Sequence, residues 1–155
     1  MTTVLDFLTP EAVIPAMRVS GKKHALHELA IQAARLTGQE ERAIYETLLQ
    51  RERLGSTGIG EGLAIPHGKL PKLGRLFGLL AKLDRPIDFE ALDGQPVDIL
   101  FLLLAPEDAG ADHLKALARI ARVLREPGLI ERIRAARDAD ALYAIVAQAP
   151  APQAA

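Results

Sequence analysis

Two nearly continuous apolar runs, at residues 76–83 and 97–104, constrain the fold of this chain more than any other feature of its sequence. Runs of this length and composition are typical of β-strands that are buried on both faces, and such strands need helices on either side. The most apolar stretch, residues 99–105, is far too short to span a bilayer as a helix. The sequence therefore predicts a sheet that is enclosed by helices.

Apolar residues at helical spacing predict the helices that surround this sheet. They cover residues 22–36, 40–54, 113–125, 129–136 and 139–147. Ser20 and Asp112 are expected to cap the first and third of these helices, and Gly38 is expected in the C′ position of the first. Residues 13–19 fit a further strand, which Pro15 confines to a sheet edge. Turn signals stand at residues 85–86 and 93–94. Together these elements predict one layered α/β domain.

The length of 155 residues suits a single domain, which we place at residues 1–148 with a disordered tail at 149–155. The net charge of −1 gives no electrostatic reason to expect nucleic acid as a partner. The absence of cysteine excludes disulfides, thiol catalysis and thiolate metal sites. The first residues lack the pattern of a secretory signal, so we expect a cytoplasmic protein without membrane insertion.

Residues 55–68 read GSTGIGEGLAIPHG and place His67 between Pro66 and Gly68. Four glycines in the preceding segment give up packing area and lose much backbone entropy on folding. Pro66 fixes its own φ and favours an extended residue before it. Gly68 lets other atoms approach the backbone beside the imidazole. The segment is therefore predicted to hold one histidine in a fixed orientation with space for a guest.

A neutral imidazole is a nucleophile near neutral pH, because its unperturbed pKa is about 6.5. Phosphorylation on a ring nitrogen gives a labile P–N bond, which suits a group that is passed on. Such transfer depends mainly on positioning and electrostatic stabilisation. The neighbouring residues offer an apolar docking rim and hydrogen-bond donors for a phosphoryl group. We assign Leu63, Ile65 and Leu70 to the rim, and Ser56, Thr57 and the backbone at Gly68 to phosphate binding.

His113 begins a predicted helix shortly after the second apolar strand. A helix N-terminus favours anions, so a second imidazole there could stabilise a phosphate on His67. Arg51, at the end of the helix before the glycine-rich segment, could add planar donors and a fixed charge. Arg53 is the rival for that role.

Other interpretations of the same residue types remain open at this point. His24 and His27 stand at i, i+3 and could share a metal, and His67 with His113 could form a zinc pair, but neither has a typical ligand pattern. The glycines lack the Lys-Ser/Thr of a nucleotide-binding loop. A basic stretch near the C-terminal end is typical of a solvated face, or could meet an acidic partner. It contains Arg119, Arg122, Arg125, Arg132, Arg134 and Arg137.

GSTGIGEGLAIPHG follows Arg51-Glu52-Arg53 and precedes DFEALDGQPVDILFLLLAPEDAGADHLKAL. With these flanks it resembles enzyme IIA of the phosphoenolpyruvate-dependent phosphotransferase system, in the mannitol/fructose-type family and closest in kind to its nitrogen-regulatory member. The resemblance implies a three-layer α-β-α sandwich with a central mixed sheet. It also implies transient phosphorylation of His67 at Nε2 by a phosphohistidine carrier of the HPr or NPr type. His113 would be the second active-site histidine and Arg51 the arginine of the site.

The leading hypothesis is therefore a phosphoryl carrier that needs no metal or organic cofactor and acts as a regulator of other proteins. Phosphorylation of His67 would switch which target the protein binds. The alternative is the IIA component of a sugar-uptake system that passes the phosphoryl group to a separate IIB protein.

Overall fold

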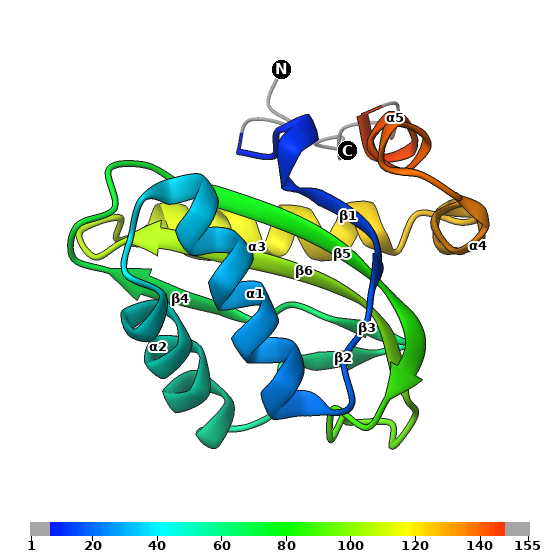
Figure 1. Cartoon of the computed structure of the whole chain (residues 1–155), viewed down its shortest axis with the longest axis horizontal. Coiled ribbons are helices and arrows are strands. Elements are labelled where there is room, and N and C mark those ends of the chain that lie inside the picture. The colour runs from blue at the N-terminus through cyan, green and yellow to red at the C-terminus, as the bar shows by residue number, and fades with distance from the viewer. Residues whose placement is uncertain (1–6, 148–155) are drawn as a thin grey trace.

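The two apolar runs form the central strands of the computed structural model, which describes residues 7–147 (Figure 1). β5 (Phe77–Ile87) and β6 (Val97–Pro106) pair antiparallel, with Leu79 opposite Leu102. β6 is buried without interruption from Ile99 to Ala105, as expected for a strand that is covered on both faces.

Shorter strands complete a six-stranded sheet on either side of this pair. They are β1 (Val13–Met17), β2 (Gly58–Gly60), β3 (Leu63–Ala64) and β4 (His67–Leu70). The sheet runs in the order β1-β5-β6-β3-β2, and β4 also pairs with β6. β1 pairs parallel with β5, and β3 and β4 pair parallel with β6, whereas β2–β3 and β5–β6 are antiparallel. The sheet is therefore mixed, and β1 is an edge strand that tolerates Pro15.

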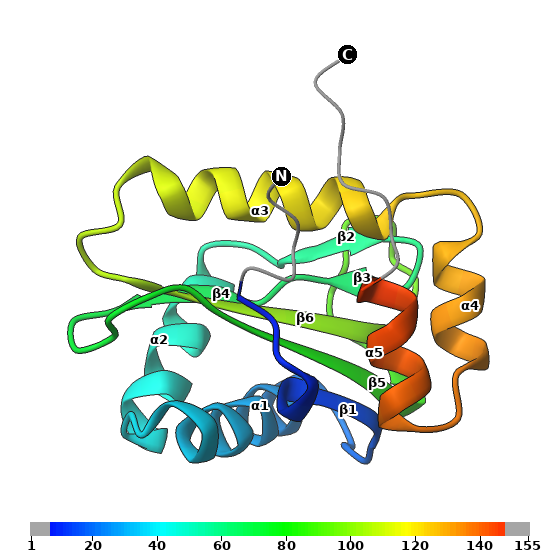
Figure 2. The ribbon, with the colours of Figure 1, turned by 90° about the horizontal axis from the view of Figure 1, so that it is seen from above.

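Helices lie on both faces of the sheet (Figure 2). α1 (Lys22–Thr37) and α2 (Glu41–Arg53) cover one face, and α3 (Ala111–Leu124) covers the other. α4 (Leu129–Ala135) and α5 (Ala139–Ala147) follow at the end of the molecule, where α5 packs against β1. This arrangement confirms the predicted three-layer α-β-α sandwich. The predicted tail at residues 149–155 lies outside the described residues.

Three local predictions are wrong. The N-cap of α1 is Gly21 instead of Ser20, whose backbone N–H and hydroxyl both contact Nδ1 of His24. α3 begins at Ala111 after Gly110, so Asp112 lies in its first turn and does not cap it. The turn predicted at residues 85–86 is part of β5. Pro86 fits there because the pairing with β6 is irregular between Lys82 and Ile87, so its missing N–H breaks no regular ladder.

The predicted C′ position at Gly38 is confirmed, with φ of 75° and its N–H bonded to the carbonyl of Ala34. A turn also forms at residues 93–94, where the N–H of Gly94 bonds the carbonyl of Ala91 and φ of Gly94 is 72°. Both glycines adopt the left-handed conformation that other residues rarely take.

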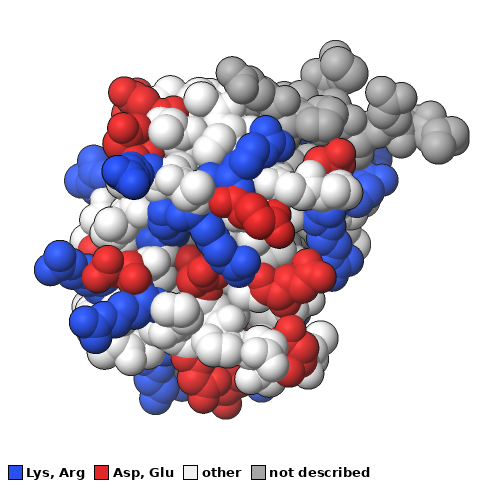
Figure 3. Space-filling view, turned by 90° about the vertical axis from the view of Figure 1, so that its right-hand side faces the viewer, with Lys and Arg blue, Asp and Glu red and all other residues white. Residues whose placement is uncertain are grey.

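The end of the molecule that carries α4 and α5 shows basic and acidic side chains interspersed, without a field of one sign (Figure 3). Arg134 in α4 illustrates this mixture, because it forms two hydrogen bonds of 2.9 and 3.0 Å with the carboxylate of Asp98. No helix among the described residues combines the length and apolarity needed to cross a membrane.

Candidate functional site

His67 is the first residue of β4, where the chain leaves a tight hairpin and joins the central sheet. β4 pairs parallel with β6, with His67 opposite Leu103, and the carbonyl of Pro66 accepts the N–H of Leu103 at 3.0 Å. The backbone on both sides of the imidazole is therefore fixed by the most buried strand of the fold. The side chain is half-buried, so part of the ring remains accessible to solvent.

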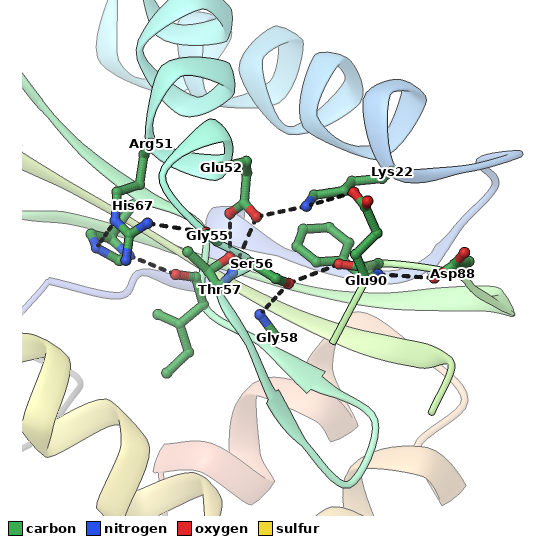
Figure 4. Close-up of polar contacts among 12 residues, drawn as sticks. Lys22, Arg51, Glu52, Gly55, Ser56, Thr57, Gly58, His67, Asp88 and Glu90 are labelled. Atoms are coloured by element: carbon green, nitrogen blue, oxygen red, sulfur yellow. Dashed lines mark hydrogen bonds and ion pairs between the residues drawn. The ribbon is translucent and has the colours of Figure 1, made fainter. Parts of the chain in front are cut away.

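The hydrogen bonds of His67 assign its tautomer. Nδ1 lies 2.8 Å from the carbonyl oxygen of Ile65, which can only accept, so Nδ1 carries a proton. In the neutral ring, Nε2 then holds a lone pair. Nε2 accepts the Nε–H of Arg51 at 3.2 Å, an arrangement that only an unprotonated Nε2 permits (Figure 4). The site thus presents a neutral imidazole with Nε2 as the nucleophilic atom.

Arg51 reaches this nitrogen from the last turn of α2. A second nitrogen of the guanidinium, Nη1, donates to the carbonyl of Gly55 at 3.1 Å, which orients the planar group across the start of the glycine-rich segment. Arg53 is exposed and lies with Arg42 and Tyr45 on the outer side of α2. The structure therefore places Arg51, and not Arg53, against His67.

His113 lies close to His67, as expected from its position near the start of α3. The two ring centroids are 5.9 Å apart and the ring planes are inclined by 42°. Nδ1 of His113 is buried, and within the described part of the chain it has no hydrogen-bond partner. One imidazole comes from β4, which pairs with β6 in the sheet, and the other from α3, which covers one face of the sheet.

Both histidines favour the neutral form. Burial is the largest cause that lowers the pKa of His67; the hydrogen bond to Ile65 opposes it, Arg51 adds to it and Glu52 opposes it. Burial also lowers the pKa of His113, with further contributions from the positive charge of Lys69 and from His67. Lys69 was not predicted as part of the site, although a residue two positions after His67 in a strand lies on the same face as His67.

Ser56 and Thr57 have other partners than the imidazole. The hydroxyl of Ser56 donates to the carbonyl of Phe89 at 2.8 Å and accepts the N–H of Gly58 at 3.0 Å. Thr57 is buried, and both its N–H and its hydroxyl donate to the carboxylate of Glu52. These side chains hold the glycine-rich segment in place, and their donors are occupied in this structure.

Gly68 is required for packing. A Cβ built at Gly68 would lie 2.4 Å from Cγ2 of Thr47, far inside any normal contact. The atoms that approach the backbone beside the imidazole thus belong to α2, which packs on β4 and thereby brings Arg51 to His67.

The predicted rim is wrong, because Leu63, Ile65 and Leu70 are all buried in the core. Residues 55–68, where the sequence predicted no strand, contain the hairpin of β2 and β3 and the start of β4. Large exposed apolar side chains occur elsewhere: Leu54 follows α2 and is 84% exposed, and Leu114 follows His113 and is 61% exposed. Each stands close in sequence to a residue of the site, Arg51 or His113.

The histidines outside this site have local partners. His24 contacts Ser20, and Nε2 of His27 lies 3.1 Å from a carboxylate oxygen of Glu41. Within residues 7–147 no three His, Asp or Glu side chains gather in a group that could hold a metal ion.

The chain is similar to known proteins over nearly its whole length. The family model described as "Phosphoenolpyruvate-dependent sugar phosphotransferase system, EIIA 2" matches residues 6–149. The nitrogen regulatory protein of Bradyrhizobium diazoefficiens is 64% identical over 148 residues, which cover 96% of this chain and 97% of that protein. A fructose-specific EIIA component of Haloferax volcanii is 30% identical over 150 residues, covering 94% of this chain and 96% of that protein.

The fold is shared with solved structures. The crystal structure of the nitrogen regulatory protein IIA-Ntr from Neisseria meningitidis superposes with a TM-score of 0.85 at 32% identity. The superposition covers 91% of this chain and 97% of that chain. Sequence and structure comparisons therefore agree over nearly the whole of the described chain.

Proposed function

Because this chain belongs to the EIIA type 2 family of the phosphoenolpyruvate-dependent sugar phosphotransferase system, we propose that it carries a phosphoryl group on Nε2 of His67. The donor is a phosphohistidine carrier protein of the HPr or NPr type. The observation that supports this most directly is the hydrogen bond from Nδ1–H of His67 to Ile65, which leaves the lone pair of the neutral ring on Nε2, where it accepts the Nε–H of Arg51.

The transfer step needs no net proton movement. The Nε2 lone pair of His67 forms a new P–N bond while the P–N bond of the donor histidine breaks, and the donor imidazole recovers its lone pair. The proton on Nδ1 stays in its hydrogen bond to Ile65 throughout. Because the pKa of His67 is lowered, the neutral nucleophile is the populated form at neutral pH.

Arg51 and His113 stabilise the transferred group. Arg51 withdraws its Nε–H from Nε2 as the phosphoryl group arrives and turns its planar donors to the phosphoryl oxygens. A proton on the buried Nδ1 of His113 would have no acceptor, which favours the tautomer protonated at Nε2. That Nε2–H is then the donor from the second ring. Positioned donors of this kind supply most of what phosphoryl transfer requires.

The regulatory role is carried by the switch in charge. A phosphoryl group brings about −1.5 to −2 charges to a half-buried imidazole flanked by Arg51 and His113. Leu54 and Leu114 are exposed and lie close in sequence to Arg51 and His113, respectively. In this proposal they serve as apolar contacts for partner proteins. Phosphorylation disfavours an apolar partner that buries this face and favours one that supplies a cation. The relatives named nitrogen regulatory protein support a regulatory role, in which this protein would act by binding target proteins.

The second candidate function is sugar uptake, in which the phosphoryl group passes to a separate IIB protein. The similarity to the fructose-specific EIIA component of Haloferax volcanii favours it. The same Nε2 chemistry would serve both roles, so the two differ only in the acceptor.

The experiment is a reconstitution with phosphoenolpyruvate, enzyme I and the carrier protein. Wild type is expected to gain one acid-labile phosphate, and His67→Ala none. His27→Ala is the matched control, because His27 is an exposed histidine on α1, and it should be labelled like wild type. Labelling of His67→Ala at the wild-type rate would refute the proposal.

Two further measurements separate regulation from sugar uptake. Onward transfer to a cysteine of a IIB protein would favour uptake. A pull-down under phosphorylating conditions, with wild type and His67→Ala, should capture different partners if phosphorylation is a switch. Identical partner profiles would contradict the regulatory role.

A further inference from the structure

Glu52 is a buried carboxylate that the proposed transfer does not itself use. It follows Arg51 in the last turn of α2, and its side chain is only 3% exposed. Within residues 7–147, Glu52 and Thr57 are the two polar residues that are buried. A buried charge is costly unless it is paired and fully hydrogen-bonded, so the partners of Glu52 decide what it does beside the site.

The carboxylate is fully engaged (Figure 4). Oε1 accepts the backbone N–H of Thr57 at 3.1 Å and contacts Nζ of Lys22 at 3.0 Å, and Oε2 accepts the Thr57 hydroxyl. Nζ of Lys22 also contacts Glu90 at 3.2 Å and lies 4.9 Å from the centre of the Phe89 ring. α1 therefore supplies the cation that holds the carboxylate in place.

A line of hydrogen bonds connects this carboxylate to the imidazole. Glu52 holds Thr57; the carbonyl of Thr57 accepts the N–H of Ile65 at 3.0 Å; and the carbonyl of Ile65 accepts Nδ1–H of His67 at 2.8 Å. The same side chain also fixes the end of α2 from which Arg51 reaches Nε2. One buried group thus acts on both nitrogens of His67 without touching either.

We infer that Glu52 is a positioning residue that holds His67 in the Nδ1–H tautomer, through Thr57 and Ile65, and keeps Arg51 aligned on Nε2. The inference rests on the proposed function of His67 as phosphoryl acceptor. The hydrogen bond made by one ring nitrogen decides which nitrogen carries the proton, so release of Ile65 would free the ring to protonate at Nε2. A proton there removes the nucleophile.

The first measurement is ¹⁵N NMR of His67 in the unphosphorylated protein at a pH where the ring is neutral. Wild type is expected to show a protonated Nδ1 and an unprotonated Nε2. In Glu52→Ala, the fraction protonated at Nε2 should rise, and the rate of labelling by the phosphorylated carrier should fall roughly tenfold to a hundredfold.

Two variants separate positioning from charge and from folding. Glu52→Gln keeps an oxygen for Lys22 and the Thr57 N–H, and its amide can donate to the Thr57 hydroxyl, so it should restore most of the wild-type tautomer and rate. Thr57→Val keeps the carboxylate but removes the hydroxyl, and should shift the tautomer in the same direction by less. If Glu52→Ala does not fold, the tautomer of His67 in Thr57→Val tests the inference.

Glu90→Gln is the matched control, because Glu90 is the exposed partner of the same Lys22 and should leave tautomer and rate unchanged. A wild-type tautomer in both Glu52→Ala and Thr57→Val would overturn the inference, whatever the labelling rate. Failure of the proposed function would look different: wild type itself would take no label, while the NMR measurement would still report on Glu52.

Discussion

The Nε–H of Arg51 points at Nε2 of His67 across 3.2 Å, and the same guanidinium is tied to the carbonyl of Gly55 at 3.1 Å. In the proposed transfer, Arg51 therefore occupies the position at Nε2 that the incoming phosphoryl group would take. This contact requires an unprotonated Nε2, and in the proposed transfer the guanidinium would offer its donors to the phosphoryl group.

Replacement of Arg51 by alanine is therefore expected to slow phosphoryl transfer to His67 by about a hundredfold, the typical cost of one lost donor at a reacting oxygen. Arg51→Lys should recover only part of the rate, because lysine keeps the charge but not the planar fork. Arg53→Ala, two residues along the same helix, is the control and should match wild type. Stopped labelling reactions with the phosphorylated carrier measure all three. Equal losses in Arg51→Ala and Arg53→Ala would contradict the assignment.

The choice between Arg51 and Arg53 could not be made from the sequence. Residues two apart on a helix point to nearly opposite sides, and only the packing of α2 on β4 decides which side faces His67. That packing depends on Gly68, whose hydrogen leaves room for Thr47. The apolar runs and helical spacing, in contrast, determine burial directly, so the strands β5 and β6 and the helices could be predicted.

The burial of the residues assigned to the docking rim could not be predicted from the sequence either. β2 and β3 are two or three residues long and rich in glycine, so they carry no alternation that would indicate strands. Leu63 and Ile65 then look like loop residues, although they are in the core. The proximity of the two histidines followed from the position of His113 near the start of a predicted helix after the second apolar strand, and the ring centroids lie 5.9 Å apart.

The contact of Gly68 with Thr47 predicts a specific effect on stability. Gly68→Ala should lower the free energy of unfolding by about 1–3 kcal/mol, since the new methyl group overlaps Cγ2 of Thr47. Thr47→Ser removes that methyl carbon, so the double variant should recover most of the loss. Urea unfolding of the two single variants and the double variant measures the coupling. Additive effects in the double variant would show that the two groups do not meet.

The lowered pKa values of His67 and His113 predict a pH dependence of stability. The unfolded chain takes up protons on these histidines as the pH falls through about 6.5, while the folded chain does not, so stability decreases as the pH falls below that value.

Urea unfolding at pH 7.5 and 5.5 tests this dependence in wild type, His67→Gln and His113→Gln. Each variant should lose less stability than wild type between the two pH values, because it lacks one histidine whose pKa is lowered by folding. His27→Gln provides the comparison with an exposed histidine. An equal loss in wild type and both site variants would contradict the burial of the two rings.

Leu114 is expected to contribute to carrier docking. Leu114→Ser should raise the KM for the phosphorylated carrier by about fivefold to thirtyfold, which corresponds to roughly 1–2 kcal/mol of lost contact. The maximal labelling rate should change little, because the side chain is exposed and is not one of the reacting groups. Thermal unfolding serves as the control, since removal of an exposed side chain should leave stability nearly unchanged. An unchanged KM would remove Leu114 from the docking surface.

The most direct test of the account is the position of the phosphate on the ring. ³¹P and ¹⁵N NMR of the labelled protein, kept at alkaline pH to preserve the P–N bond, identifies the nitrogen that is bonded to phosphorus. The account predicts a single phosphohistidine at His67 with phosphorus on Nε2 and a proton retained on Nδ1. Phosphorus on Nδ1, or on any other residue, would contradict it.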